Sequence, residues 1–208
     1  MFTGIPAAAL DFYEDLAADN SKAFWTAHKD VYDSAVKAPM TALMAELEPE
    51  FGTAKIFRPF RDVRFSKDKT PYKTAQGAVV RTGAGAGYYV QIDASGLYLG
   101  GGFYSGMPEQ VARFRAAVDE EVRGAELIAI LDKLRKAKFT VGGDQLKTKP
   151  KGYEADHPRI ELLRHKSLVV SKSVGCPDWL HTKRAATEVR KSWEAIRPLV
   201  EWLAAVVG

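Results

Sequence analysis

Residues 77–104 read GAVVRTGAGAGYYVQIDASGLYLGGGFY, and this stretch decides the fold. It contains three short segments rich in β-branched and aromatic residues, as is typical of strands, at 77–82, 88–93 and 97–104. The middle segment alternates Tyr, Val and Ile on one face with Tyr, Gln and Asp on the other. The connections between the segments are too short for a crossover, so neighbouring strands must be antiparallel. The stretch therefore predicts an antiparallel β-meander.

Helical patterns surround this predicted sheet. Residues 7–18 place apolar side chains at helical spacing, and Asp19, Asn20 and Ser21 are suited to cap a second helix. Pro39 suits the first turn of a third helix. Helices resume at Pro108, and the chain ends in a helical pattern in which Pro198 is expected to start a new helix or to kink the old one. The sequence predicts one further strand, at 168–170.

Helices, a meander and helices again predict an α+β fold, in which N-terminal and C-terminal helices pack a central antiparallel β-meander. We expect a single domain over 1–208. It is helical over 1–53, forms the sheet over 55–104, and is helical with a basic turn region over 107–208.

The composition is that of an ordinary globular protein. Hydrophobic residues make up 46% and charged residues 27% of the 208 residues, which excludes a disordered, collagen-like or coiled-coil chain. The apolar runs fall far short of the about 18 residues of a membrane span, and the N-terminus lacks a signal-peptide pattern. We therefore expect a cytoplasmic protein with no membrane partner.

The sequence offers no pattern for a metal or a cofactor, and we expect neither. The single cysteine, Cys176, excludes a disulfide framework and a cysteine zinc cluster, and we interpret it as a small apolar residue. The four histidines are not at metal-ligand spacing. The glycine-rich run at 83–87 joins two strands and opens no helix, so it lacks the geometry of a phosphate-binding loop.

The net charge of +4 is unevenly distributed. Segment 55–73 carries seven basic and two acidic residues, and segment 133–166 carries ten and four. Residues 1–54 carry three basic and nine acidic residues. If the two basic segments fold together, they form a positive patch that concentrates anions. The alternative is that the acidic N-terminal helices pair with them, or that the charges only solvate the surface.

The first basic segment contains FRPFRDVRFSKDKTPYK at 57–73. In a strand over 61–66, Arg61 would share a face with Val63 and Phe65. An arginine on an apolar face needs a carboxylate or a phosphate to meet its planar fork. Arg61 is therefore expected to be largely buried, with either an internal carboxylate or a ligand as its partner.

The residues after this predicted strand form a loop with a proline-set turn beside Tyr72. Several cations that converge without matching carboxylates form an anion site, and loops held by a rigid sheet are where function concentrates. The motif predicts a ligand site made by Arg61, Arg64, Lys67, Lys69 and Lys73. A purely structural network of ion pairs is the alternative.

A second turn-rich block reads PKGYEADHP at 150–158. Its simplest interpretation is a turn followed by a capped helix that begins at Pro158. The functional interpretation adds Lys149, Lys151 and His157 to the first block around one anion, with His157 as a general acid or base. If the protein is an enzyme, the candidate catalytic residues are Asp62, Tyr72 and His157.

These motifs resemble those of a known family. RDVRFSKDKTPYK at 61–73 resembles the hallmark of domain of unknown function 2461 (DUF2461), a group of conserved hypothetical proteins found mainly in bacteria. The block at 150–158 is similar to the family's later motif, and 88–92 with the glycine run at 100–102 fits its glycine-rich strand region. The resemblance covers nearly the whole chain and implies no established activity.

Two positions depart from the family pattern. The family usually has two asparagines before its first aromatic pair, whereas Asn20 is followed here by Ser21. It also tends to have a histidine just after the Tyr-Lys pair, where this chain has Thr74. Chemistry that needed that histidine would be missing from this chain.

Three functions from different classes remain. The first is binding of a phosphorylated or carboxylated small molecule, with catalysis left open. The second is a nucleic-acid-binding module, favoured by lysines interleaved with aromatic residues and disfavoured by the acidic segments. The third is a scaffold in which the motif is structural. A concave pocket favours the first, a flat positive surface the second, and an internally paired Arg61 the third. The oligomeric state is not predicted.

Overall fold

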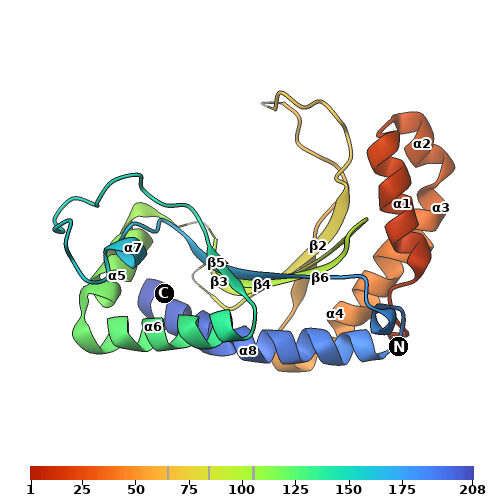
Figure 1. Ribbon diagram of the computed structural model, residues 1–208. Coiled ribbons are helices and arrows are strands. Elements are labelled where there is room, and N and C mark those ends of the chain that lie inside the picture. The colour runs from red at the N-terminus through yellow and green to blue at the C-terminus, as the bar shows by residue number, and fades with distance from the viewer. Residues whose placement is uncertain (65, 84, 105) are drawn as a thin grey trace. The chain divides into compact units, whose positions relative to one another are not determined.

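The computed structural model describes residues 1–64, 66–83, 85–104 and 106–208. Its strands form one six-stranded antiparallel sheet with the order β1-β2-β3-β4-β6-β5 (Figure 1). The strands are β1 (Ala54–Ile56), β2 (Ala75–Arg81), β3 (Ala86–Asp93), β4 (Gly96–Phe103), β5 (Thr140–Gly142) and β6 (Leu168–Gly175). The predicted α+β fold, with a meander at its centre and helices from both ends of the chain packed against the sheet, is confirmed.

The helices fall where the sequence places them, before and after the meander. They are α1 (Ala7–Ala18), α2 (Lys22–Ala27), α3 (Lys29–Val31), α4 (Ala38–Phe51), α5 (Pro108–Asp119), α6 (Glu121–Lys136), α7 (Ile160–Leu163) and α8 (Arg184–Val207). A π-helical turn (Tyr32–Lys37) joins α3 to α4, and a 3₁₀ turn (Asp178–His181) precedes α8.

The chain divides into two compact units. Unit 1 comprises Met1–Val80, Tyr89–Leu99 and Ser173–Lys191, and unit 2 comprises Arg81–Tyr88, Gly100–Lys172 and Ser192–Gly208. The single-domain organisation stays a prediction.

The core of unit 1 forms around the first helix. The buried residues of α1 are Ala9, Phe12, Tyr13 and Leu16, the spacing of an amphipathic helix. The Phe12 ring lies 5.9 Å from that of the buried Trp25, whose helix α2 is capped by the Ser21 side chain as predicted. Aromatic side chains from two helices therefore fix the N-terminal part of the chain.

The core of unit 2 is built on the second half of α8. Trp193 is fully buried with its ring centroid 5.3 Å from that of Tyr88, and Trp202 meets Phe114 of α5 edge-on at 6.2 Å. Pro198 does not start a new helix, because α8 continues through it. Its side chain faces solvent, where the carbonyl that loses its N–H partner can bind water.

The glycine run in β4 serves close packing. A Cβ atom at Gly102 would lie 2.3 Å from the Leu168 carbonyl oxygen, and one at Gly101 would lie 2.6 Å from Ile196. Side chains at these positions would push β4 away from β6 and α8.

The strand predicted over 61–66 is wrong. Residues 61–64 and 66 form no strand, and Phe65 lies outside the described residues. Here polar side chains bind the nearby backbone and compete with a strand ladder: the Lys69 ammonium donates to the Val63 carbonyl at 2.9 Å. The helix predicted to begin at Pro158 instead begins at Ile160 as the single turn α7. The sequence also missed the short strand β5.

Candidate functional site

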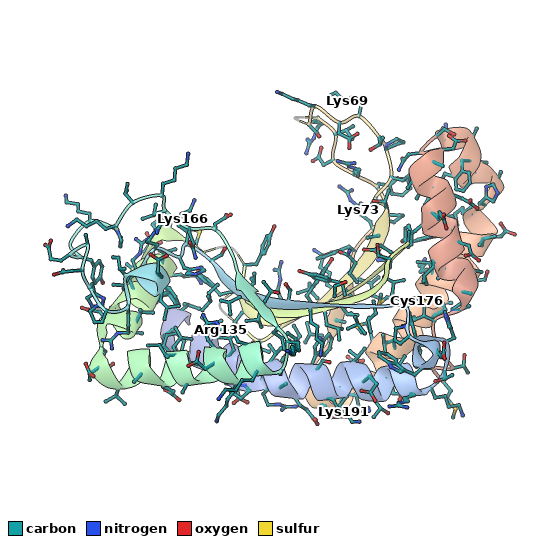
Figure 2. The ribbon with its side chains drawn as sticks, in the orientation of Figure 1. Lys69, Lys73, Arg135, Lys166, Cys176 and Lys191 are labelled. Carbon is teal, nitrogen blue, oxygen red and sulfur yellow. The ribbon has the colours of Figure 1, made fainter. Side chains whose placement is uncertain are left out.

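The RDVRFSKDKTPYK motif (residues 61–73) lies in the segment between β1 and β2, which we call the motif loop (residues 57–74). Its two sides pair as an extended hairpin, with an isolated antiparallel bridge between Phe60 and Tyr72. The Arg61 N–H donates to the Pro71 carbonyl at 2.9 Å. Figure 2 places Lys69 at the tip of this loop and Lys73 at its base.

The base of the loop is fixed by an asparagine that is distant in sequence. The Asn20 amide donates to the Tyr72 carbonyl at 3.1 Å, and its oxygen accepts from the Tyr72 N–H at 3.0 Å. The Asn20 side chain thus satisfies both the N–H and the carbonyl of Tyr72, as a paired β-strand would. Sequence analysis noted Asn20 only as half of a family pattern, and nothing in its local sequence reveals a partner 52 residues away.

Aromatic stacking adds to this anchor. The Tyr72 ring stacks on Trp25 with centroids 4.3 Å apart and planes 7° apart, and both residues are buried. Beside them the Tyr32 hydroxyl donates to the buried Gln76 amide oxygen at 2.7 Å. Burial raises the pKa of Tyr32 to about 12, which keeps this donor protonated. The candidate catalytic residue Tyr72 is therefore part of the packed base of the loop.

Arg61 has an internal carboxylate partner. Its guanidinium donates to Asp68 at 2.5 Å and to the Thr70 hydroxyl at 2.7 Å. Thr70 also binds Asp68 through its backbone N–H and its hydroxyl, and these bonds, led by the backbone one, lower the pKa of Asp68. The side chain of Arg61 is 34% exposed, so it is half-buried rather than largely buried. The bonds of Arg61 therefore join two parts of the motif loop to each other.

Arg64 is paired in the same way. Its guanidinium binds both oxygens of Asp62, at 2.9 and 2.6 Å, and this pairing lowers the pKa of Asp62 and raises that of Arg64. A carboxylate held ionised by a bidentate arginine is a poor proton donor. The structure thus gives Asp62 an electrostatic role in the loop.

Three other cations of the motif loop differ from Arg61 and Arg64 in their surroundings. Among the described residues, no carboxylate lies within ion-pair distance of Arg58, Lys67 or Lys73. The Lys73 ammonium lies 5.3 Å from the centre of the Phe57 ring, and partial burial together with Arg58 lowers the pKa of Lys73. Arg58 is therefore close enough to Lys73 for its positive charge to act on that ammonium.

The second basic block, in unit 2, is mostly paired. The Lys149 ammonium binds Glu154 at 3.1 Å and the Tyr153 carbonyl at 2.7 Å. The Nδ1 atom of His157 accepts from the Arg159 N–H, and its Nε2 atom lies 3.0 Å from Asp119. Lys151 is exposed.

The motif loop belongs to unit 1 and residues 149–157 belong to unit 2. That Lys151 and His157 join the first block around one anion stays a prediction.

The sequence comparison agrees with the motifs. The model of the conserved hypothetical protein family DUF2461 matches residues 8–202. The chain belongs to the DUF2461 family. No curated protein matches it.

The two departures from the DUF2461 pattern can now be placed. Asn20 keeps its bonds to Tyr72, and Ser21, where the family usually has a second asparagine, accepts from the Phe24 N–H at 3.1 Å as a helix cap. Thr74, where the family tends to have a histidine, is exposed at the base of the motif loop. At the position of the second asparagine, Ser21 therefore serves as the N-cap of α2.

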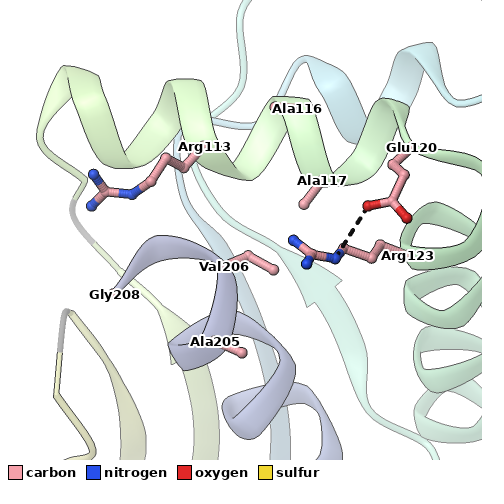
Figure 3. A pocket seen from close by; sticks show the side chains of 8 residues that line it. All are labelled: Arg113, Ala116, Ala117, Glu120, Arg123, Ala205, Val206 and Gly208. Carbon is pink, nitrogen blue, oxygen red and sulfur yellow. Dashed lines mark ion pairs between the residues drawn. The ribbon is translucent and has the colours of Figure 1, made fainter.

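A shallow pocket of about 370 Å³ lies in unit 2 between α5, α6 and the end of α8 (Figure 3). Its two arginines are already engaged: Arg113 donates to the Val207 carbonyl at 2.6 Å, and Arg123 pairs with Glu120 at 3.1 Å. None of the residues predicted for the ligand site lines this pocket.

Cys176 differs from its prediction as a small apolar residue. It is exposed, and its sulfur lies 3.4 Å from Nε2 of His181. The Nδ1 atom of His181 lies 2.8 Å from the Ile5 carbonyl oxygen, so it carries the proton and leaves Nε2 to accept from the thiol. The five-residue spacing of the pair was visible in the sequence, but the contact with Ile5 was not.

Within the described ranges, no group of three or more His, Cys, Asp or Glu side chains could hold a metal ion. The helices of the same residues include none that is long and apolar enough to cross a membrane.

Proposed function

We propose that the protein binds an anionic ligand, a phosphate or a carboxylate, at the base of the motif loop between Arg58 and Lys73. The observation that carries this proposal is the imbalance of charge there. Arg64 and Arg58 both lower the pKa of the Asp62 carboxylate, and Arg64 occupies both of its oxygens. No carboxylate among the described residues forms an ion pair with Lys73. Cations held close together without a carboxylate attract an anion.

The paired arginines take a supporting role in this proposal. Arg61 and Arg64 use their guanidinium groups within the loop, and the Lys69 ammonium is bound to a backbone carbonyl. They give the loop its shape, whereas Arg58 and Lys73 meet the ligand. Lys67 has no carboxylate partner among the described residues and can add to the positive potential.

Thermal unfolding with inorganic phosphate tests the proposal. At about 100 times the dissociation constant, binding stabilises the folded state by roughly 2.7 kcal/mol, which is visible as a rise in Tm. The R58Q/K73Q double variant should lose this rise.

The matched control is K133Q/K136Q, which removes the same charge from exposed positions of α6 and should keep the rise. Equal shifts for the wild type and both variants would mean that phosphate acts without a site. Loss of the shift in K133Q/K136Q alone would place the anion away from the motif loop and overturn the proposal.

A non-catalytic scaffold is the second candidate function, and the internal pairing of Arg61 with Asp68 favours it. In that case the motif loop is a structural element whose cations need no ligand. The two functions differ in one result, because a scaffold shows no phosphate-dependent rise in Tm in any of these proteins.

A further inference from the structure

One face of the sheet in unit 1 carries partly exposed aromatic and polar side chains. Along β3, buried residues alternate with partly exposed ones, and Tyr89, Gln91 and Asp93 belong to the exposed set. Successive side chains of a strand point to opposite faces, so these three lie on the face turned away from the core. Tyr98 of β4 is partly exposed between two buried leucines.

Three rings form a row on this face. The centroid of Tyr89 lies 6.3 Å from that of Phe57 on one side and 6.3 Å from that of Tyr98 on the other. Gly77 of β2 makes room for this row, since a Cβ atom there would lie 2.5 Å from the Tyr89 hydroxyl. We call Phe57, Tyr89 and Tyr98 the aromatic face.

The aromatic face has a positive end. Lys73 lies over its Phe57 ring, with Arg58 close by. From Tyr89 a chain of hydrogen bonds runs along β3: the Tyr89 hydroxyl donates to the Gln91 oxygen at 2.7 Å, and the Gln91 amide donates to Asp93 at 2.8 Å. The face therefore runs from two cations, across aromatic rings, to an amide and a carboxylate.

We propose that the anionic ligand is a nucleoside phosphate, whose phosphate binds Arg58 and Lys73 and whose base stacks on the aromatic face. This rests on the proposed function, because the same two cations hold the phosphate. Nucleobases stack on aromatic side chains through their π-faces. A ligand with one anionic end and one planar, polar end is complementary to the face in both charge and chemistry.

The distribution of charge favours a single nucleotide over a nucleic acid strand. Arg58 and Lys73 lie at one end of the face only, and Asp93 at the other end would repel a continuing phosphate backbone. Unit 1 also contains residues 1–54, with nine acidic and three basic side chains.

Calorimetric titration with adenosine 5′-monophosphate, and with ribose 5-phosphate as the control that lacks the base, tests this proposal. Stacking of one base predicts that the wild-type protein binds the nucleotide about 5- to 150-fold more tightly than the sugar phosphate. Y89L should lose this preference and keep its affinity for ribose 5-phosphate. Y89F should keep the preference, because it retains the ring. Y98L serves in place of Y89L if that variant does not fold.

Four results would contradict the inference or the proposed function. Equal affinity of the wild type for both ligands overturns the nucleoside inference and leaves the anion site standing. A preference that survives in both Y89L and Y98L also overturns it, because the base would then bind elsewhere. Failure to bind either ligand or phosphate overturns the proposed function itself. Binding of a ten-residue oligothymidylate far more tightly than the mononucleotide would identify a strand as the ligand and contradict the inference.

Discussion

The motif loop and residues 149–157 look alike in sequence and differ in how their charges are matched. In residues 149–157, Lys149 has Glu154 and His157 has Asp119. In the motif loop Arg61 and Arg64 are paired, whereas Arg58 and Lys73 form no ion pair with a carboxylate of the described residues. The anion site that we propose therefore depends on which cations lack a carboxylate partner, and not on the total number of lysines and arginines.

The two segments also differ in their anchoring. The motif loop is tied down by buried aromatic rings and by an asparagine bonded to its backbone. The loop around Lys149 is held mainly by exposed ion pairs and by backbone contacts such as that between Leu146 and Arg164. The anion site that we propose lies in the segment with the firmer support.

The largest expected effect comes from the anchor of the motif loop. Trp25→Ala should lower the free energy of unfolding by about 3–5 kcal/mol, because it removes a large buried ring that stacks on Tyr72. Lys149→Ala, which breaks an exposed ion pair, should cost at most about 1 kcal/mol. Urea denaturation of both variants measures the difference. Similar losses would mean that the two segments are anchored alike.

The asparagine anchor should show the next largest effect. Asn20→Ala leaves the N–H and the carbonyl of Tyr72 without these bonds, which should cost about 1–3 kcal/mol in urea denaturation. Asn20→Asp keeps an acceptor for the N–H and loses the donor, so it should lie between Asn20→Ala and the wild type. An alanine variant as stable as the wild type would show that these bonds contribute nothing.

The free energy of unfolding should decrease in acid because of His165 in unit 2. Burial lowers the pKa of this histidine, whose ring lies between the Ser167 carbonyl and the Gln145 amide. Below about pH 6.5 the unfolded chain binds a proton that the folded chain does not, so stability should fall as pH falls. The slope is at most about 1.4 kcal/mol per pH unit for one group.

The variant His165→Gln tests this pH dependence. It should flatten the slope of the unfolding free energy against pH between pH 7.5 and pH 5, as measured by urea denaturation. An unchanged slope in His165→Gln would assign the acid sensitivity to other groups.

The smallest effect concerns the predicted meeting of the two blocks. If Lys73 and Lys151 bind one anion, their alanine substitutions should be non-additive in phosphate affinity, with a coupling of at least about 0.5 kcal/mol. A double-mutant cycle by calorimetry measures this coupling. Additive losses, or no loss in Lys151→Ala, would confine the site to the motif loop.

The fold was predictable because its signals are local. The alternation in β3, the helical spacing in α1 and the Ser21 cap each depend on residues a few positions apart. The strand predicted over 61–66 failed because alternation alone does not reveal that Asp68 and Thr70 will bond within the loop.

The candidate site was predictable only in its location. The sequence pointed to the motif loop, but it could not separate Arg61, which has a carboxylate partner, from Arg58, which has none within the described part of the chain. That distinction depends on which side chains meet after folding. The row of Phe57, Tyr89 and Tyr98 was hidden for the same reason, because it joins three separate segments.

The position of a bound anion tests the central claim most directly. A crystal structure from sulfate or phosphate should show the anion between the guanidinium of Arg58 and the ammonium of Lys73, with Arg61 and Arg64 still paired with carboxylates of the motif loop. An anion held instead by Arg61 and Arg64, with those carboxylates displaced, would contradict the account, and so would an unoccupied space between Arg58 and Lys73 at saturating anion.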